Sequence, residues 1–434
     1  MISETLALFP ITTSISDEGR LTVAGHDLTT LAQKWGTPLY LYDATTVRQQ
    51  AGLLQDWLKQ HYAGPSQVTY AAKAYFSLGW ARQINALGLG VDVVSEGELQ
   101  IAQKAGFQPR KVHLHGNNKS IQELQPALDW GVQSIVVDNL EELDYLESLA
   151  DKRQKTARIW LRLSPGLDVH THAYVQTAHH SSKFGIPVDD GQAARAIRAA
   201  QKSRWLRLTG LHTHLGSQIF EIEPYTRAIE IFGRLAHQEG FIPEEISPGG
   251  GWGVPYLPGK PEQSAEDMVK AVCQTLEEQC TRYRWPLPIL VLEPGRWLSA
   301  QAGIALYTIG TQKISSDGTR FVAIDGGLAD NPRPALYQAQ YTALVANKAN
   351  QVPVQTVNLV GRYCESGDQL IFGLPLPEVQ RGDVVAVPVA GAYQLSMASN
   401  YNLAPRPAVL WLEEGRVSVL QKREQPVSTG WWID

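Results

Sequence analysis

The stretch Val68-Thr69-Tyr70-Ala71-Ala72-Lys73-Ala74 is a short apolar run that ends in a single lysine. Similar aliphatic runs follow it, and the amphipathic segments between them have the apolar spacing of helices. The predicted strands are residues 68–72, 91–94, 111–115, 134–137, 157–163, 208–214, 244–247 and 288–293. The predicted helices include residues 96–106, 121–131, 140–150, 189–203, 223–240 and 265–282. This alternation predicts a parallel sheet whose strands are connected by helices.

The number of predicted strands favours one parallel fold over the others. Eight strands with intervening helices are the content of a closed (β/α)8 barrel. We therefore expect an α/β protein with a TIM barrel over residues 38–300. The run at 244–247 is the weakest of the eight, and a doubly wound open sheet is the alternative that the pattern leaves open.

The pattern changes after about residue 300. The runs that follow are strand-like and are separated by Gly, Pro and Asp turns: residues 303–311, 320–325, 353–360, 383–390, 407–412 and 416–421. Short strand-like pieces also occur near the N-terminus. We predict a second, mostly antiparallel β domain, resembling a β-sandwich or Greek key, made of residues 1–37 and 301–434.

Composition excludes several classes of protein. The chain has 434 residues, of which 44% are hydrophobic and 19% charged, with a net charge of −5. These values indicate a folded globular protein and support neither a nucleic-acid nor a membrane-surface role. No basic leader precedes the apolar N-terminus, and no apolar stretch approaches the roughly 20 residues of a membrane span. Three cysteines cannot form a disulfide framework, so we expect a reducing cytoplasmic location.

The predicted strands of the barrel end in polar residues and glycines. These are Lys73, Ser95, Glu96, His115, Asp138, Asn139, Arg162, Ser164, His212, His214, Gly249 to Gly251 and Glu293. In barrel enzymes the chemistry collects at the C-terminal ends of the strands. The segments that begin loops are polar in most proteins, which is the plain alternative. We place a candidate site at this rim.

A glycine-rich segment, Ser247-Pro248-Gly249-Gly250-Gly251-Trp252-Gly253, follows the seventh predicted strand. Glycines allow backbone N–H groups to approach and surround an anion. A phosphate site after strands seven and eight recurs in barrels, although a tight turn would explain the glycines as well. The segment lacks the Gly-Lys-Ser/Thr ending of a nucleoside-triphosphate loop.

Lys73 and Glu293 suggest a particular cofactor. A lysine just beyond a buried strand is well placed to form a Schiff base with pyridoxal phosphate. In Glu293-Pro294-Gly295-Arg296 the acid could keep the pyridine nitrogen of that cofactor protonated. Arg296 could bind a substrate carboxylate through two hydrogen bonds. A solvated lysine and a structural Glu–Arg pair are the alternatives.

Two histidines end the sixth predicted strand, in His212-Thr213-His214-Leu215-Gly216-Ser217. Their spacing of two places both on one face. A metal pair is one reading, but no further His or Asp set completes a coordination sphere, so we expect no metal. The other reading is an imidazole stacked on a planar cofactor, with Ser217 reaching its phosphate. The histidines in 170–172 and 179–180 are interpreted as solvated loop residues.

Cys364 differs from the other two cysteines. Cys273 and Cys280 are seven residues apart in a predicted helix and belong to its core face. Cys364 lies in Cys364-Glu365-Ser366-Gly367-Asp368, among polar residues and turn formers, where a thiol can act as an acid or nucleophile or remain inert. Turn-like segments also contain Arg333, Tyr337 and Tyr393, which could be ordinary surface residues.

Taken together and in order, these motifs resemble those of the diaminopimelate decarboxylases. That family belongs to the fold-type III pyridoxal phosphate enzymes, with alanine racemase and ornithine decarboxylase as relatives. The matching segments span nearly the whole chain: residues 70–74, 115–120, 182–186, 212–218, 249–251, 293–296, 333–337, 364–368, 391–393 and 396–402. The order of these segments is far more specific than any single motif.

The resemblance implies a pyridoxal phosphate barrel, a β domain that includes the N-terminal segment, and a head-to-tail homodimer with shared active sites. Lys73 would be the Schiff-base lysine, and Cys364, from the other subunit, the proton donor. The implied cofactor-binding residues are Lys73, His214, Ser217, Gly250, Gly251, Glu293, Gly295, Arg296 and Tyr393. The implied substrate-binding residues are Arg296, Arg333, Tyr337, Glu365 and Tyr393.

The reaction implied by the resemblance is decarboxylation of meso-2,6-diaminopimelate to L-lysine and CO2, the last step of lysine biosynthesis. Two positions depart from the family pattern: Trp252 replaces a smaller aliphatic residue, and Gln340-Tyr341 replaces a Tyr-His pair. Both leave fine substrate preference open.

Several rival functions share parts of this pattern. The same chemistry could act on another basic amino acid or on carboxynorspermidine, although Arg296 and Arg333 favour a substrate with a distal carboxylate. A racemase would not need the segment around Cys364. A non-catalytic regulatory homologue and a metal-dependent barrel hydrolase are the remaining alternatives.

Overall fold

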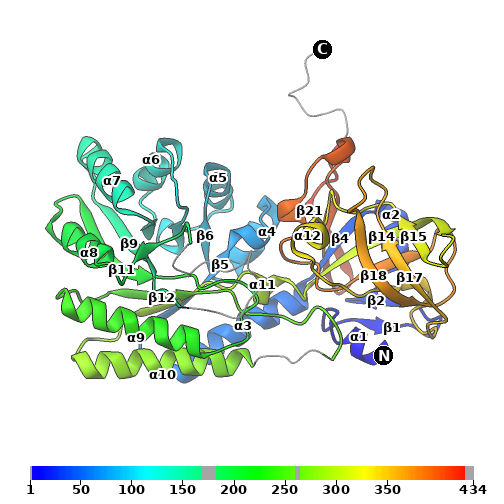
Figure 1. Cartoon of the computed structure of the whole chain (residues 1–434), viewed down its shortest axis with the longest axis horizontal. Helices are drawn as coiled ribbons and strands as arrows, with labels where there is room; N and C mark the ends of the chain where they lie inside the picture. Colours follow the sequence, from blue (N-terminus) through cyan, green and yellow to red (C-terminus); the bar gives the residue numbers. More distant parts are fainter. Residues whose placement is uncertain (1, 168–181, 260–263, 426–434) are drawn as a thin grey trace, which may run out of the picture. The chain divides into compact units, whose positions relative to one another are not determined.

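A computed structural model describes residues 2–167, 182–259 and 264–425 of the chain (Figure 1). The described residues divide into two compact units. Residues 51–167, 182–253 and 264–297 form one, called the barrel below. Residues 2–50, 254–259 and 298–425 form the other, called the β domain. The predicted solvated histidines at 170–172 and 179–180 lie outside the described residues.

The barrel is a closed ring of eight parallel strands. They are β5 (Ser66–Ala71), β6 (Gly90–Val93), β7 (Val112–Leu114), β8 (Ser134–Val137), β9 (Ala157–Ser164), β11 (Leu206–His212), β12 (Glu245–Gly249) and β13 (Ile289–Leu292). Each strand pairs with the next, and β13 pairs with β5 to close the ring. The short strand β10 (Ile186–Pro187) extends β9 on one side. The predicted TIM barrel is therefore confirmed, and the open sheet is excluded.

Helices connect the strands and lie around the ring (Figure 1). They are α3 (Ala44–His61), α4 (Leu78–Ala86), α5 (Glu96–Lys104), α6 (Ile121–Trp130), α7 (Leu140–Arg153), α8 (Gln192–Lys202), α9 (Glu223–Gln238) and α10 (Ala265–Tyr283). Several begin at side-chain caps: Ser95 Oγ accepts from Glu98 N at 3.3 Å, and Asn139 Oδ1 accepts from Glu142 N at 2.8 Å. Among the described residues, no helix is long and apolar enough to cross a membrane.

Side chains fill the interior of the barrel. Trp160 is fully buried and packs against Val136 and Val291. Its indole N–H donates to Glu245 Oε2 at 2.7 Å, and Thr209 Oγ1 donates to the same oxygen at 2.9 Å. A filled interior leaves the rim at the C-terminal strand ends as the place where a ligand can bind.

The β domain is built on a mixed sheet with the order β18-β17-β15-β14-β4-β20-β21, to which β16 and β19 are attached. These strands are β4 (Leu39–Asp43), β14 (Gly303–Ile314), β15 (Arg320–Ile324), β16 (Leu344–Val345), β17 (Gln355–Val360), β18 (Gln369–Leu376), β19 (Val384–Val387), β20 (Ala408–Glu413) and β21 (Arg416–Gln421). Most neighbours are antiparallel, whereas β15 with β17 and β4 with β20 are parallel. The predicted β domain is confirmed.

The N-terminal segment belongs to the core of this domain. It contains α1 (Ile2–Leu6), α2 (Leu28–Trp35) and a small sheet of β1 (Ser14–Ile15), β2 (Leu21–Val23) and β3 (His26–Asp27). Leu28 and Leu31 of α2 share one buried cluster with Leu41 and Ile304. Strand β4 lies within the range predicted for the barrel, but it belongs to the β domain. It pairs with β14 and β20, and all five of its residues are buried.

Candidate active site

Lys73 lies beyond the end of β5, on the short 3₁₀ turn η1 (Ala72–Ala74). Its neighbours Ala72 and Ala74 are buried, whereas Lys73 is exposed. Its Nζ lies 3.4 Å from Nε2 of His214, which follows β11. Burial and the nearby charge of Lys73 hold the pKa of His214 well below its usual range. The structure therefore places an accessible amine beside a neutral imidazole.

Glu293 directly follows β13 and is buried at the same rim. Its Oε1 accepts a hydrogen bond from Ser247 Oγ at 2.6 Å, and its Oε2 lies 3.0 Å from His212 Nε2. Burial alone would raise the pKa of Glu293, but the charge and hydrogen bond of His212 outweigh burial and lower it. The result is a buried, ionised carboxylate, which can keep a ring nitrogen protonated.

A second acid, Asp92 of β6, lies close to this group but differs in ionisation. Burial, together with the charge of Glu293, raises the pKa of Asp92 well above its usual range. Asp92 Oδ1 is 3.4 Å from His115 Nε2, and the His115 ring meets the His212 ring edge to face at 4.9 Å. The rim thus places two buried carboxyl groups in environments that shift their pKa values in opposite directions.

The same cluster has the composition of a metal site. Donor atoms of His115, His212 and Glu293 lie within 4.8 Å of one another, and all three residues are buried. The spacing of residues in the sequence did not reveal this group, and His214 is not part of it. Both oxygens of Glu293 are engaged by Ser247 and His212, whereas His115 Nε2 and His212 Nδ1 have no hydrogen-bond partner among the described residues.

The glycine segment after β12 forms a close-packed cradle. A Cβ atom on Gly250 would overlap the carbonyl oxygen of Glu293, and one on Gly251 would overlap that of Gly216. Tyr225 Oη donates to the Gly250 carbonyl at 2.9 Å and fixes the loop. Among the described residues, the backbone N–H groups of Gly250 and Gly251 donate to no protein acceptor. Two such N–H groups on a glycine loop suit a phosphate.

Arg296 and Ser217 meet beside this cradle. Arg296 Nη2 donates to Ser217 Oγ at 2.7 Å, and Arg296 is buried. Because the serine oxygen accepts this bond, its hydroxyl proton is available to an anion. Gly295 precedes Arg296 in the same turn. The structure therefore brings together the predicted Lys73 and His214 in one group and the predicted Ser217 and Arg296 in another.

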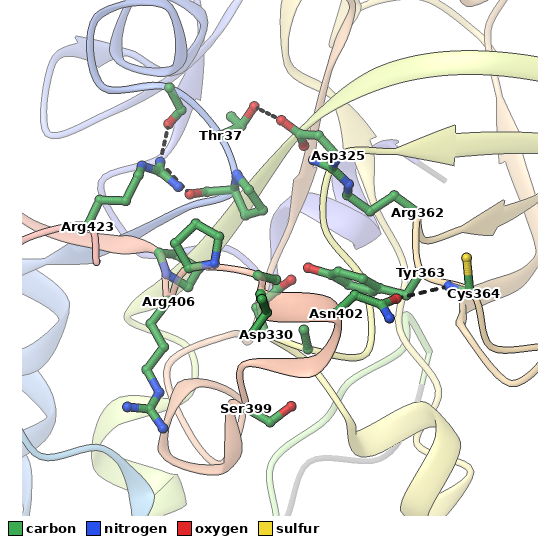
Figure 2. A pocket seen from close by; sticks show the side chains of 17 residues that line it. Thr37, Asp325, Asp330, Arg362, Tyr363, Cys364, Ser399, Asn402, Arg406 and Arg423 are labelled. Atoms are coloured by element: carbon green, nitrogen blue, oxygen red, sulfur yellow. Dashed lines mark hydrogen bonds between the residues drawn. The ribbon is translucent and has the colours of Figure 1, made fainter. Parts of the chain in front are cut away.

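The β domain contains the other candidate residues, among them the exposed Cys364. It is the only exposed cysteine of the three, and none forms a disulfide. Its backbone N–H donates to Asn402 Oδ1 at 3.2 Å (Figure 2). Glu365 is also exposed, and its Oε1 accepts from Gly367 N at 3.3 Å. This loop presents a thiol and a carboxylate to the surroundings.

Arg333 begins α12 (Arg333–Tyr337), and half-buried Tyr337 ends it. Arg333 Nη1 donates to Tyr341 Oη at 2.6 Å. The Arg333 guanidinium lies 5.0 Å from the ring centre of Tyr256, whose ring meets that of Tyr341 edge to face at 5.4 Å. Two tyrosines therefore hold the orientation of a buried arginine.

Tyr393 has a left-handed backbone with φ of 60° and is half-buried. The next residue, Gln394, is buried, and its Oε1 lies 3.0 Å from Tyr40 Oη. Tyr40 Oη is also 3.1 Å from Asp330 Oδ2, which accepts from Tyr307 Oη at 2.5 Å. This buried network supports the strained position of Tyr393.

Several residues around these sites were not singled out from the sequence. Asp92 is a lone acid within an apolar strand, and that contrast could have revealed it. Ser247 was quoted in the glycine segment but received no role, and its contact with Glu293 has no sequence signal. Asp330 accepts from Tyr40, which lies far along the chain and which only the fold brings close. Tyr341 was named in the sequence only as a departure from the family pattern, and its bond to Arg333 was not predicted.

Comparison with known proteins agrees with this geometry. Residues 47–300 match the family model described as pyridoxal-dependent decarboxylase, pyridoxal binding domain. The chain is 41% identical to the diaminopimelate decarboxylase of Halalkalibacterium halodurans over 421 residues, covering 95% of each chain. It is also 41% identical to that of Bacillus subtilis over 416 residues, covering 94% of each.

Solved structures resemble the chain over almost its whole length. A crystal structure of diaminopimelate decarboxylase from M. jannaschii has a TM-score of 0.89 and 31% identity, covering 96% of each chain. A structure of the M. jannaschii enzyme in complex with L-lysine has a TM-score of 0.90 and 30% identity, covering 98% of each. The rim residues fit a phosphorylated pyridine cofactor, and the chain belongs to the diaminopimelate decarboxylase family of pyridoxal-dependent decarboxylases.

Proposed function

We propose that this protein converts meso-2,6-diaminopimelate to L-lysine and CO2, with pyridoxal phosphate as cofactor, in the last step of lysine biosynthesis. The observation that carries the proposal is the buried, ionised Glu293 at the rim that also presents Lys73. Such a carboxylate suits a protonated pyridine ring. Membership of the family and the lysine complex of the M. jannaschii structure support the same substrate and product.

The barrel residues would hold the cofactor. Lys73 would anchor its aldehyde, and His214 would lie on the ring face. Gly250, Gly251, Gly295, Ser217 and Arg296 would surround the phosphate, with Tyr393 beside them. Pyridoxal phosphate, when bound, supplies an electron sink for the electrons released as CO2 leaves.

The protein's own groups would then perform the remaining steps. Glu293 keeps the proton on the ring nitrogen. Arg333, with Tyr337, binds the distal carboxylate of the substrate, and Arg296 is the second candidate for this role. Glu365 lies near the substrate amino group, and the Cys364 thiol returns a proton to Cα. These roles remain predictions that the substitutions below test.

We further propose a homodimer in which each active site takes Cys364 from one subunit and Lys73 from the other. The exposed loop position of Cys364 supports delivery to another chain. Mixing Lys73→Ala and Cys364→Ala proteins tests this arrangement, because a mixed dimer regains one intact site. Random mixing would restore about a quarter of the native activity. If the mixture stays inactive although native mass spectrometry detects mixed dimers, shared sites are excluded.

The absence of disulfides among the three cysteines is in keeping with a reducing compartment, and we place the enzyme in the cytoplasm. Small amino acids, and neither nucleic acids nor membranes, are its expected partners.

The decisive experiment is CO2 release by the cofactor-loaded protein from meso-diaminopimelate, ornithine, lysine and arginine, offered separately. Release from diaminopimelate with formation of lysine supports the proposal. Release from another amino acid instead would retain the chemistry and reject the substrate. The cluster of His115, His212 and Glu293 gives the metal-dependent hydrolase a specific test. A stoichiometric bound metal, with neither pyridoxal phosphate nor CO2 release, would favour that alternative.

A further inference from the structure

A cavity of about 540 Å³ lies within the β domain (Figure 2). Residues from 36–38, 325–330, 362–364 and 399–407 line it, together with Arg423. Its volume is in the range of small-molecule sites in proteins. None of the residues assigned to the cofactor lines this cavity, so its ligand would be a separate one.

Three arginines line the cavity, and none forms an ion pair with a carboxylate among the described residues. Figure 2 shows Arg406 and Arg423 on one side and Arg362 on the other. Arg423 Nη2 donates to neutral acceptors, the carbonyl oxygens of Trp35, Gly36 and Pro38, at 2.8 to 3.3 Å. Arg406 Nη2 reaches only a carbonyl oxygen, that of Ala398, at 3.5 Å. Three guanidinium groups therefore retain donors for a ligand.

The acids near the cavity are already engaged by donors of the protein. Asp325 accepts from Thr308 N at 2.9 Å and from Thr37 Oγ1. Asp330 accepts from Gly327 N at 2.9 Å and from Tyr307 Oη at 2.5 Å.

Glu424, which lies beside Arg406, accepts from Arg406 N at 3.0 Å and from Asn400 Nδ2 at 2.5 Å. The acids have few lone pairs left for an ammonium group, whereas the arginines retain their donors. The cavity thus favours an anion over a diamine or a zwitterion.

The cavity also has an apolar part and a link to Cys364. Leu403, Ala404 and Pro405 add carbon surface to its lining. Cys364 lines the cavity itself, and its backbone N–H is bonded to Asn402, another lining residue. Tyr401 Oη also donates to the Cys364 carbonyl oxygen at 3.4 Å. A ligand held between Arg362 and Arg406 would connect the same two segments that these hydrogen bonds join.

We propose that this cavity binds a small organic anion, with a carboxylate or phosphate group on a carbon frame, and that binding immobilises the Cys364 loop. Arg362 and Arg406 hold the anionic group from opposite sides, and the segment 403–405 contacts the carbon frame. Of the residues that line the cavity, Cys364 alone has a proposed role in the decarboxylase reaction, and the binding test below does not require that activity.

Binding is tested by calorimetry on the cofactor-loaded protein with succinate, glycerol 3-phosphate, glycine and ethylenediamine as separate probes. Succinate and glycerol 3-phosphate distinguish a carboxylate from a phosphate ligand, whereas glycine and ethylenediamine represent a zwitterion and a dication. We expect at least one of the two anions to bind with a Kd of about 1 mM or lower. Arg362→Gln and Arg406→Gln should each weaken binding about tenfold, because each removes a charge-assisted hydrogen bond.

The matched control is Arg416→Gln, an exposed arginine on β21 that does not line the cavity and should leave the Kd unchanged. Binding of neither anion, native affinity in both cavity variants, or preference for glycine or ethylenediamine would overturn the proposal.

A second readout follows the loop directly. Cys364 is the only exposed cysteine, so alkylation by iodoacetamide reports on this residue, and Cys364→Ser gives the background rate. The anion that binds should slow alkylation severalfold in the native protein and leave the rate in Arg362→Gln nearly unchanged. An alkylation rate that does not respond to a saturating anion would reject the immobilisation of the loop.

Discussion

In the barrel, Lys73, His214 and Glu293 follow strand ends within two positions, whereas in the β domain the candidate residues lie in loops and one short helix. Lys73 is two residues beyond β5, and Glu293 is the first residue after β13. Cys364, by contrast, is four residues beyond β17. Strand ends are fixed by the sheet, so the barrel side is rigidly positioned, while the positions of the loop residues depend on side-chain contacts.

The two regions also differ in how they treat buried acids. In the barrel, His212 keeps Glu293 ionised, in a position that suits a cationic ring. In the β domain, burial raises the pKa of Asp330 to about 6 despite its hydrogen bonds to Tyr307, Gly327 and Tyr40. The barrel thus holds a fixed charge for chemistry, and the β domain holds a carboxyl group that supports structure. This contrast is in keeping with the proposed division, in which the barrel binds the cofactor and the β domain selects the substrate and returns the proton.

The largest expected effect comes from the barrel. Lys73→Ala should lower kcat for CO2 release from diaminopimelate by about four orders of magnitude, because the proposed anchor of the cofactor aldehyde is lost and Lys119, another amine near the strand ends, is held by Glu142. The measurement is CO2 release under saturating cofactor. Lys59→Ala, an exposed lysine on α3, is the control and should keep native kcat. Substantial activity in Lys73→Ala would contradict the proposal that Lys73 of the barrel anchors the cofactor.

The next largest effect tests the β domain. Cys364→Ala should lower kcat about a thousandfold and leave bound pyridoxal phosphate unchanged, since the thiol is proposed to return a proton and the residues proposed to hold the cofactor are unaltered. Cofactor content is measured by absorbance after desalting, alongside kcat. Lys59→Ala serves again as the control and should behave as the native enzyme. Full activity in Cys364→Ala would sink the proton-donor role, and loss of cofactor would contradict the division between the two regions.

The contrast in ionisation predicts a pH effect on stability. A carboxyl group has a pKa of about 4 in an unfolded chain, whereas that of Asp330 is raised to about 6. Between these values the folded state keeps a proton that the unfolded state has lost. The free energy of unfolding should therefore fall as the pH rises from about 4 to 6, by about 3 kcal/mol at most, and then level off.

Asp330→Asn cannot titrate and should lack this part of the pH dependence. Urea midpoints of the native protein and the variant, measured across this pH range, give the difference. Asp144→Asn, at an exposed position of α7, controls for general charge effects. Identical slopes for native and Asp330→Asn proteins would mean that Asp330 stays ionised.

Much of the fold could be predicted because local patterns agree with tertiary structure. The weakest predicted strand, 244–247, corresponds to β12 (Glu245–Gly249), since its parallel neighbours bury it on both faces. Strand β18 (Gln369–Leu376) was missed, because Gly373 and Pro375 interrupt an otherwise apolar run. Its place depends on pairing with β17, which a local pattern does not encode.

The residues of the candidate site also divide into those that the sequence could predict and those that it could not. Lys73, His214 and Glu293 could be found because strand ends in a barrel converge by topology. Their partners could not: Ser247 bonds Glu293 from 46 residues away in the chain. Tyr341 was noticed only as a departure from the family pattern, and its bond to Arg333 shows what the change does. Side-chain partners of this kind follow from packing and have no signature in the sequence.

The smallest expected effect concerns the hydrogen bond from Arg333 to Tyr341, and it tests whether the β domain selects the substrate. Tyr341→Phe removes the oxygen that accepts from Arg333 Nη1 and leaves the packing against Tyr256 intact. We expect KM for diaminopimelate to rise about tenfold, because a hydrogen bond to a charged group is lost, with kcat changed less than about twofold. Steady-state kinetics of the purified variant gives both constants, and Tyr145→Phe, an exposed tyrosine on α7, is the matched control.

A purely structural role for Tyr341 is separated from this one by two inhibitors. Decarboxylation removes the carboxylate at the reacting carbon, so L-lysine retains the distal carboxylate that Arg333 is proposed to bind, and its inhibition constant should rise together with KM in Tyr341→Phe. Cadaverine has no carboxylate, so its inhibition constant should be the same for the native enzyme and the variant. If Tyr341→Phe weakened cadaverine as much as L-lysine, a general loosening of the β domain would explain the rise in KM, and Arg333 would not be reading the distal carboxylate. The assignment of substrate selection to the β domain would then have to rest on Tyr337 and Glu365.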